Sequence, residues 1–146
     1  MRALGIAIGN PLRRDDGAAH HVPMPAGFER RSLIQLSPEV AEEIALFDLV
    51  VFLDASATAT EPGVEPVAEP ARPTSGSPFT HVCSPSEIVA LARRLFGFSG
   101  RAYLCHIPAQ DFSTGEKLSA RATRFAQEAA AEIEHIAAKI EHIIGA

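Results

Sequence analysis

"RALGIAIGNPLRRDDG", residues 2–17, joins a short apolar run to a Gly-Asn-Pro break and then to two adjacent aspartates. The nearly continuous apolar residues up to Ile8 are typical of a strand that is buried on both faces of a parallel sheet. Asp15 and Asp16 follow at the point where such a strand would connect to a helix. Two explanations are open here, namely capping of a short helix and ligation of a metal ion.

The rest of the chain alternates between predicted strands and helices. Short apolar runs predict strands at residues 32–36, 49–53, 64–68 and 102–107. Helices are predicted at residues 37–47 and 84–96, and from about residue 118 onward. The second helix opens with a Ser-x-x-Glu capping box at Ser84 and Glu87. Prolines restrict the strand at 64–68 to a sheet edge, and Pro23 and Pro25 limit any helix after Gly17 to a turn or two.

The last helix carries one apolar stripe at spacings of three and four residues. Its members are Leu118, Ala122, Phe125, Ala129, Ile133, Ile136, Ile140 and Ile143. Such a stripe needs a sheet or another helix to cover it. Together with the alternating strands, it predicts an α/β sandwich around a mainly parallel sheet.

Size and composition exclude several classes of protein. With 146 residues, we expect one domain over residues 1–146. The formal net charge of −5 argues against a nucleic-acid partner, and no apolar run is long enough to span a bilayer. Two cysteines, Cys83 and Cys105, are too few for a disulfide framework. We therefore expect a cytoplasmic protein with no membrane partner, and we expect a monomer because no heptad or apolar patch is evident.

Candidate site residues lie where predicted strands end. Asp16 follows the first strand and Asp54 ends the strand at 49–53. Ligands of open α/β sheets bind beyond the carboxyl ends of the strands, so these two carboxylates can converge. His81, just before the capped helix, supplies a nitrogen donor. One imidazole and two carboxylates suit an open zinc or nickel site.

Each of these residues also has a purely structural explanation. Asp16 can cap a short helix that starts at Gly17, Asp54 can close a turn, and His81 can be a surface residue. Further histidines have structural or solvent-exposed roles as the simplest explanation; these are His20, His21, His106, His135 and His142. For His106, packing in the core or support of the site are both open. The two cysteines fit as small buried apolar residues.

Four sequence blocks, in order, resemble the hydrogenase maturation endopeptidases. They are "GNPLRRDDG" at 9–17, "LFDLVVFLDA" at 46–55 with "EPG" at 61–63, "THVCSPSEIVALARRLFG" at 80–97 and "IPAQDFSTGEKLS" at 107–119. The blocks cover most of the chain, and their combination is more specific than any one of them.

The resemblance implies a fold, a site and an activity. The fold is a three-layer α/β/α sandwich around a twisted, mainly parallel five-stranded sheet of the phosphorylase/hydrolase-like type. The site consists of Asp16, Asp54 and His81, both as metal ligands and as the catalytic set. The activity is removal of the C-terminal peptide from a [NiFe] hydrogenase large-subunit precursor, with the nickel carried by that precursor.

The chain departs from the family in one place. The segment after Gly17 is shorter than the full helix expected there, and it contains Pro23 and Pro25. This motivates an alternative, a non-catalytic, nickel-dependent checkpoint or chaperone of hydrogenase maturation. A small-molecule hydrolase or ligand-binding domain that uses the acids as hydrogen-bond acceptors is a third, weaker alternative.

Overall fold

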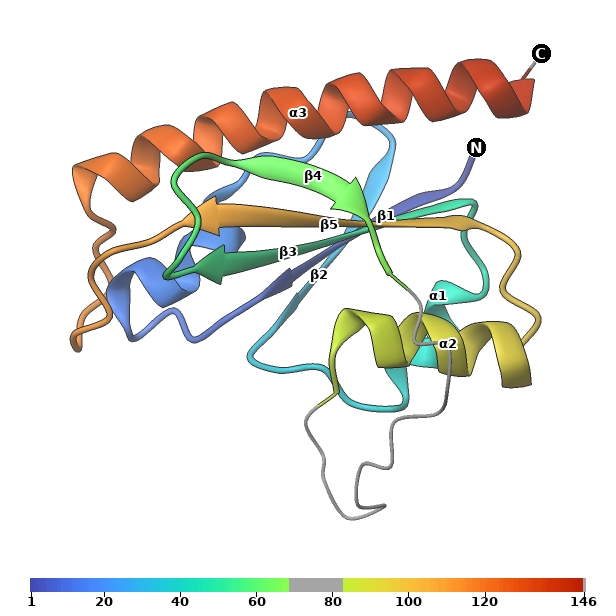
Figure 1. Ribbon diagram of the computed structural model, residues 1–146, viewed down its shortest axis with the longest axis horizontal. Coiled ribbons are helices and arrows are strands. Elements are labelled where there is room, and N and C mark those ends of the chain that lie inside the picture. The colour runs from blue at the N-terminus through green and yellow to red at the C-terminus, as the bar shows by residue number, and fades with distance from the viewer. Residues whose placement is uncertain (69–82, 146) are drawn as a thin grey trace.

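The computed structural model describes residues 1–68 and 83–145 and contains a five-stranded sheet (Figure 1). In chain order the strands are β1 (Ala3–Ile8), β2 (Phe28–Leu33), β3 (Leu49–Ser56), β4 (Gly63–Pro66) and β5 (Arg101–Pro108). Their order in the sheet is β2-β1-β3-β5-β4, and all neighbours are parallel except the antiparallel pair of β4 and β5. The central strands β1 and β3 therefore end at the same edge of the sheet.

Helices cover both faces of the sheet, which confirms the predicted three-layer sandwich. The short 3₁₀ helix η1 (Arg14–His21) and the long helix α3 (Ala120–Gly145) pack on one face. Helices α1 (Val40–Ile44) and α2 (Pro85–Leu95) pack on the other (Figure 1). Alternate residues of β3 supply the two cores, with Val51 facing α3 and Phe52 facing α1 and α2.

Several elements agree with the sequence prediction. Helix α2 has the predicted capping box, in which the Ser84 hydroxyl accepts from the Glu87 N–H and the Glu87 carboxylate accepts from the Ser84 N–H. Strand β4 is an edge strand. The apolar stripe of α3 is buried through most of its length, but Ile143, close to the C-terminal end of the helix, is 49% exposed. Within the described ranges, no helix has the length and hydropathy needed to cross a membrane.

The second strand was predicted at 32–36, but β2 occupies Phe28–Leu33. The prediction was wrong because this edge strand is rich in charged residues and lacks an apolar pattern. The guanidinium of Arg30 donates to the carbonyls of Ala19, His20 and Val22, so its partners belong to the end of η1. Those partners cannot be seen in the local sequence.

The helix predicted at 37–47 is also shorter than expected. Helix α1 spans Val40–Ile44, and no side-chain cap is formed at its start. Ser37 contributes its backbone carbonyl, which accepts from the Val40 N–H, rather than its hydroxyl. Without a side-chain cap the helix begins later than the Ser-Pro-Glu pattern predicts.

We expect the buried part of α3 to carry much of the stability of its core. Ile133 is fully buried, whereas Ile144 on the same helix is 46% exposed. Ile133→Ala is expected to lower the free energy of unfolding by about 2–5 kcal/mol, since it removes buried methyl groups and leaves a cavity. Ile144→Ala is the matched control, with an expected change within about 0.5 kcal/mol in the same urea titration. Equal effects would mean that α3 is not seated as described.

Candidate functional site

The turn after β1 brings η1 against the end of the sheet. Gly9 has a φ of 143°, and a Cβ there would lie 1.9 Å from the Asp16 carbonyl oxygen. Only glycine therefore permits this approach. The His20 imidazole bonds the Gly9 carbonyl through Nε2 at 2.8 Å, which gives His20 a structural role.

Asp15 is fully buried and fully hydrogen-bonded. One carboxylate oxygen, Oδ2, accepts from the backbone N–H groups of Gln110 (2.9 Å) and Asp111 (3.0 Å) and from the Ser119 hydroxyl (2.8 Å). The other, Oδ1, accepts from the Ser119 N–H at 2.8 Å. Asp15 thus fastens η1 to the segment between β5 and α3, which we call the 110–119 segment.

The ionisation of Asp15 follows from these contacts. Burial by itself raises the pKa of this carboxyl, but the bonds from Gln110, Ser119 and Asp111 outweigh it and lower the pKa below 3.8. The carboxylate is therefore charged at neutral pH although it is out of contact with solvent. Its stabilising effect is present above the ordinary aspartate pKa and is lost as the pH falls below it.

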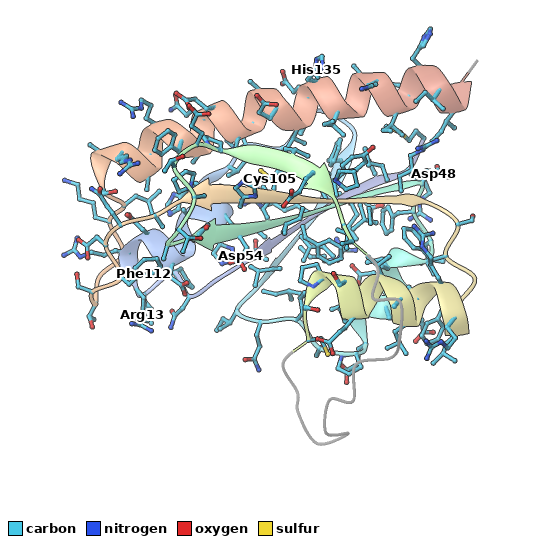
Figure 2. All side chains as sticks on the ribbon, viewed as in Figure 1. Arg13, Asp48, Asp54, Cys105, Phe112 and His135 are labelled. Atoms are coloured by element: carbon cyan, nitrogen blue, oxygen red, sulfur yellow. The ribbon has the colours of Figure 1, made fainter. Side chains whose placement is uncertain are left out.

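Two arginines add to the attachment of the 110–119 segment. Arg13 donates from Nε to the Phe112 carbonyl at 3.2 Å, and Figure 2 shows the two residues together beside η1. The Arg14 N–H donates to the Gly115 carbonyl at 2.8 Å, and Arg14 has a φ of 42°, which few residues other than glycine adopt. The backbone leading to Asp16 is therefore held by the 110–119 segment.

Asp16 does not cap a helix that starts at Gly17. The 3₁₀ helix already begins at Arg14, and Arg13 in the N-cap position makes no side-chain cap. The Asp16 carboxylate instead accepts from the Asn10 N–H at 2.8 Å through Oδ2. The side chain is half-buried, so its remaining acceptor sites are available to a ligand.

Asp54 lies near the carboxyl end of β3, whereas Asp48 directly precedes the start of the strand (Figure 2). Burial is the main reason that its pKa is raised, to about 6. The N–H of Ala55 partly opposes the rise, and the negative charge of Asp16 adds to it. The structure therefore brings Asp16 and Asp54 close enough for their charges to repel.

A cleft of about 560 Å³ opens beside Asp54, within the size range of small-ligand sites. The end of β3 and the residues that follow it, 55–59, form one wall of the cleft. The other walls come from Glu65 on β4, from Leu104 and His106 on β5, and from Pro85 at the start of α2. The cleft combines apolar surface with two acids and an imidazole. Of these, Glu65 was missed at the sequence level; the only available signal is its place two residues after the "EPG" block.

His81, the third predicted ligand, lies outside the described residues. Among the residues that the structure does describe, no three His, Cys, Asp or Glu side chains form a group able to hold a metal ion. Of the three predicted site residues, the structure therefore describes two, Asp16 and Asp54, whose charges interact.

Neither cysteine has the features of a nucleophile. Cys105 is fully buried among the side chains facing α3, and burial, with the charge of Glu132, raises the pKa of its thiol to about 12. Burial and the charges of Glu87 and Glu39 also raise the pKa of Cys83. Reactive thiols have a lowered pKa, so both cysteines act as small apolar residues.

The fold is that of the hydrogenase maturation endopeptidases. The chain superposes on the hydrogenase maturating endopeptidase HybD from E. coli with a TM-score of 0.68, over 97% of this chain and 93% of that one, at 16% identity. The [NiFe] hydrogenase maturation protease HycI from Thermococcus kodakarensis gives a TM-score of 0.64 at 20% identity, over 95% and 91% of the two chains. A hydrogenase 2 maturation peptidase from a Thaumarchaeota archaeon gives 0.63 at 14% identity, over 94% and 99%.

No protein-family model and no curated protein matches the sequence. At such low identities, the similarity to the solved structures establishes the fold. The resemblance predicted from the four sequence blocks is thereby confirmed at that level.

The two adjacent aspartates are expected to differ sharply in their effect on stability. Asp15→Ala leaves buried N–H donors of the 110–119 segment without a partner, and we expect it to lower the free energy of unfolding by at least about 3 kcal/mol. Asp16→Ala removes a single bond to the half-buried Asn10 N–H, with an expected cost of about 1 kcal/mol. Urea unfolding at neutral pH measures both. A loss from Asp16→Ala as large as that from Asp15→Ala would contradict this assignment.

Asp54 is expected to destabilise the metal-free protein when it is charged. Because its pKa rises from 3.8 to about 6 on folding, the fold loses stability as the pH rises through this window. Asp54→Asn should therefore raise the free energy of unfolding at pH 7 by about 1–2 kcal/mol, part of the penalty being screened by solvent.

The measurement is urea unfolding in EDTA from pH 4 to pH 7, and the gain should disappear toward pH 4. Asp48→Asn is the matched control, because Asp48 directly precedes the same strand. Its carboxylate accepts from the Arg2 N–H at 2.8 Å, so the amide is expected to bring no gain. A gain from Asp54→Asn that does not depend on pH would point to packing rather than charge.

Proposed function

We propose that this chain is an endopeptidase that removes the C-terminal peptide of a [NiFe] hydrogenase large-subunit precursor after nickel insertion. The fold it shares with HybD and HycI supports this proposal. So does a cleft at the carboxyl end of the sheet, where ligands of open α/β sheets bind. We place the activity in the cytoplasm and take the chain to act as a monomer.

The main support is the convergence of Asp16 and Asp54. They come from separate segments, and the charge of Asp16 contributes to the raised pKa of Asp54. Two carboxylates that repel one another in the metal-free protein are relieved by a divalent cation between them. Nickel presented by the precursor meets this requirement, with oxygen ligands from both acids and, following the sequence resemblance, an imidazole nitrogen from His81.

The residues have distinct tasks in this mechanism. Asp16 and Asp54 bind the substrate's nickel and so fix the precursor in the cleft. Asp15 positions Asp16 through its bonds to the 110–119 segment. A metal ion in such a site can polarise a carbonyl oxygen or lower the pKa of a bound water, which is the chemistry that peptide hydrolysis needs.

The test is cleavage of a nickel-loaded large-subunit precursor. Asp16→Asn and Asp54→Asn keep the shape of each side chain but remove the charge that binds a cation. Each is expected to reduce the cleavage rate at least about 100-fold, while circular dichroism and thermal unfolding show a folded protein. Asp48→Asn, at the other end of β3, is the control and should cleave normally.

Two other outcomes would have clear meanings. Normal cleavage by Asp16→Asn would remove that residue from the site. Stable binding of the precursor by the wild type without peptide release would instead favour the checkpoint or chaperone function.

A crystal soaked in nickel or cadmium adds an independent measurement, with anomalous peaks expected about 2.0–2.3 Å from the ligand atoms of Asp16, Asp54 and His81.

A further inference from the structure

His106 on β5 lies beside Asp54 on the wall of the cleft. It is the register partner of Asp54 across the parallel pair of β3 and β5, and it lines the same cleft. Register partners on neighbouring strands point to the same face of a sheet, so the two side chains are neighbours. The His106 side chain is 29% exposed, so it is not enclosed in the interior. Core packing, one of the explanations open from the sequence, therefore does not account for it.

Gly63 on β4 explains how the ring is seated. A Cβ at this position would lie 2.8 Å from His106 Nε2 and 3.0 Å from Cε1. The backbone of Gly63 does not have a positive φ, so its conformation does not require glycine. The space that the imidazole occupies is what excludes a larger residue, and β4 is thus shaped around the ring.

Glu65 restrains the ring from a second direction. Its Oε1 lies 3.9 Å from His106 Nδ1, and it stands two residues beyond Gly63 on the same strand. One ring nitrogen therefore faces an acid at ion-pair distance, while the other lies over the glycine. The ring is held on the cleft wall by β4 rather than by the core.

We propose that His106 is a specificity-determining residue that hydrogen-bonds the polypeptide substrate in the cleft beside Asp54. The chemical class of this ligand rests on the proposed function. A ring nitrogen of an imidazole can donate or accept a hydrogen bond, which suits the C=O or the N–H group of a peptide backbone. Leu104, two residues earlier on the same strand, adds apolar surface along the same wall. His106 thus holds the chain of the substrate, whereas Asp16 and Asp54 hold its metal.

Three variants and one control test the proposal. His106→Leu removes both hydrogen-bonding groups, and Gly63→Ala keeps the histidine but displaces its ring. His106→Gln restores a donor and an acceptor at the same place. His135→Leu is the control, because His135 is an exposed histidine on α3, away from the cleft (Figure 2). Thermal unfolding confirms that each variant is folded.

The assay uses a nickel-loaded large-subunit precursor, with KM and kcat for cleavage and Kd for binding to the immobilised chain. We expect His106→Leu and Gly63→Ala to raise KM and Kd by about tenfold, the loss of one hydrogen bond, and to change kcat by less than about threefold. His106→Gln should recover most of the affinity, and His135→Leu should match the wild type. A purely structural role would lower the thermal stability without this separation of KM from kcat.

Failure of this proposal is distinguishable from failure of the proposed function. If the wild type binds the precursor but does not cleave it, the endopeptidase assignment fails, and the Kd of His106→Leu still decides the role of His106. Unchanged KM and Kd in both His106→Leu and Gly63→Ala would overturn the proposal. If the wild type does not bind the precursor, both proposals fail together.

Discussion

The carboxylate of Asp15 accepts four hydrogen bonds inside the protein, and the geometry of the site depends on them. Its donors belong to the 110–119 segment, while Asp15 itself lies in η1, next to Asp16. A charge removed from solvent is tolerated only when it is fully bonded in this way. The connection between β1 and η1 is consequently fixed to the connection between β5 and α3. The backbone of Asp16, the next residue after Asp15, is held in place by the same bonds.

Two adjacent carboxylates thus have opposite functions. Asp15 is satisfied by the protein itself, and its hydrogen bonds keep its pKa low. The Asp16 carboxylate accepts only from the Asn10 N–H among the described residues, and its charge contributes to the raised pKa of Asp54. The charges of Asp16 and Asp54 therefore destabilise the fold, whereas the hydrogen bonds of Asp15 stabilise it. This pattern is expected where a binding site is built on a rigid support.

The sequence predicts those parts of the structure whose cause is local. The apolar runs of β1 and β3, the Ser84 capping box and the stripe of α3 each carry their own pattern, and the ends of β1 and β3 predict the approach of Asp16 and Asp54. Strand β2 was misplaced because Arg30 bonds carbonyls of η1. The burial of Asp15 and the seat of His106 over Gly63 could not be predicted either, because they depend on contacts between separate strands and loops.

The separation in sequence between Asp15 and its partners has a consequence for the order of folding. The hydrogen bonds join residues 95 to 104 positions apart, so closing them carries the entropy cost of a long loop. During synthesis, the amino-terminal strands can pair long before the 110–119 segment has left the ribosome. Asp16 then has no fixed position until the 110–119 segment has been made, so a shorter nascent chain lacks the assembled site.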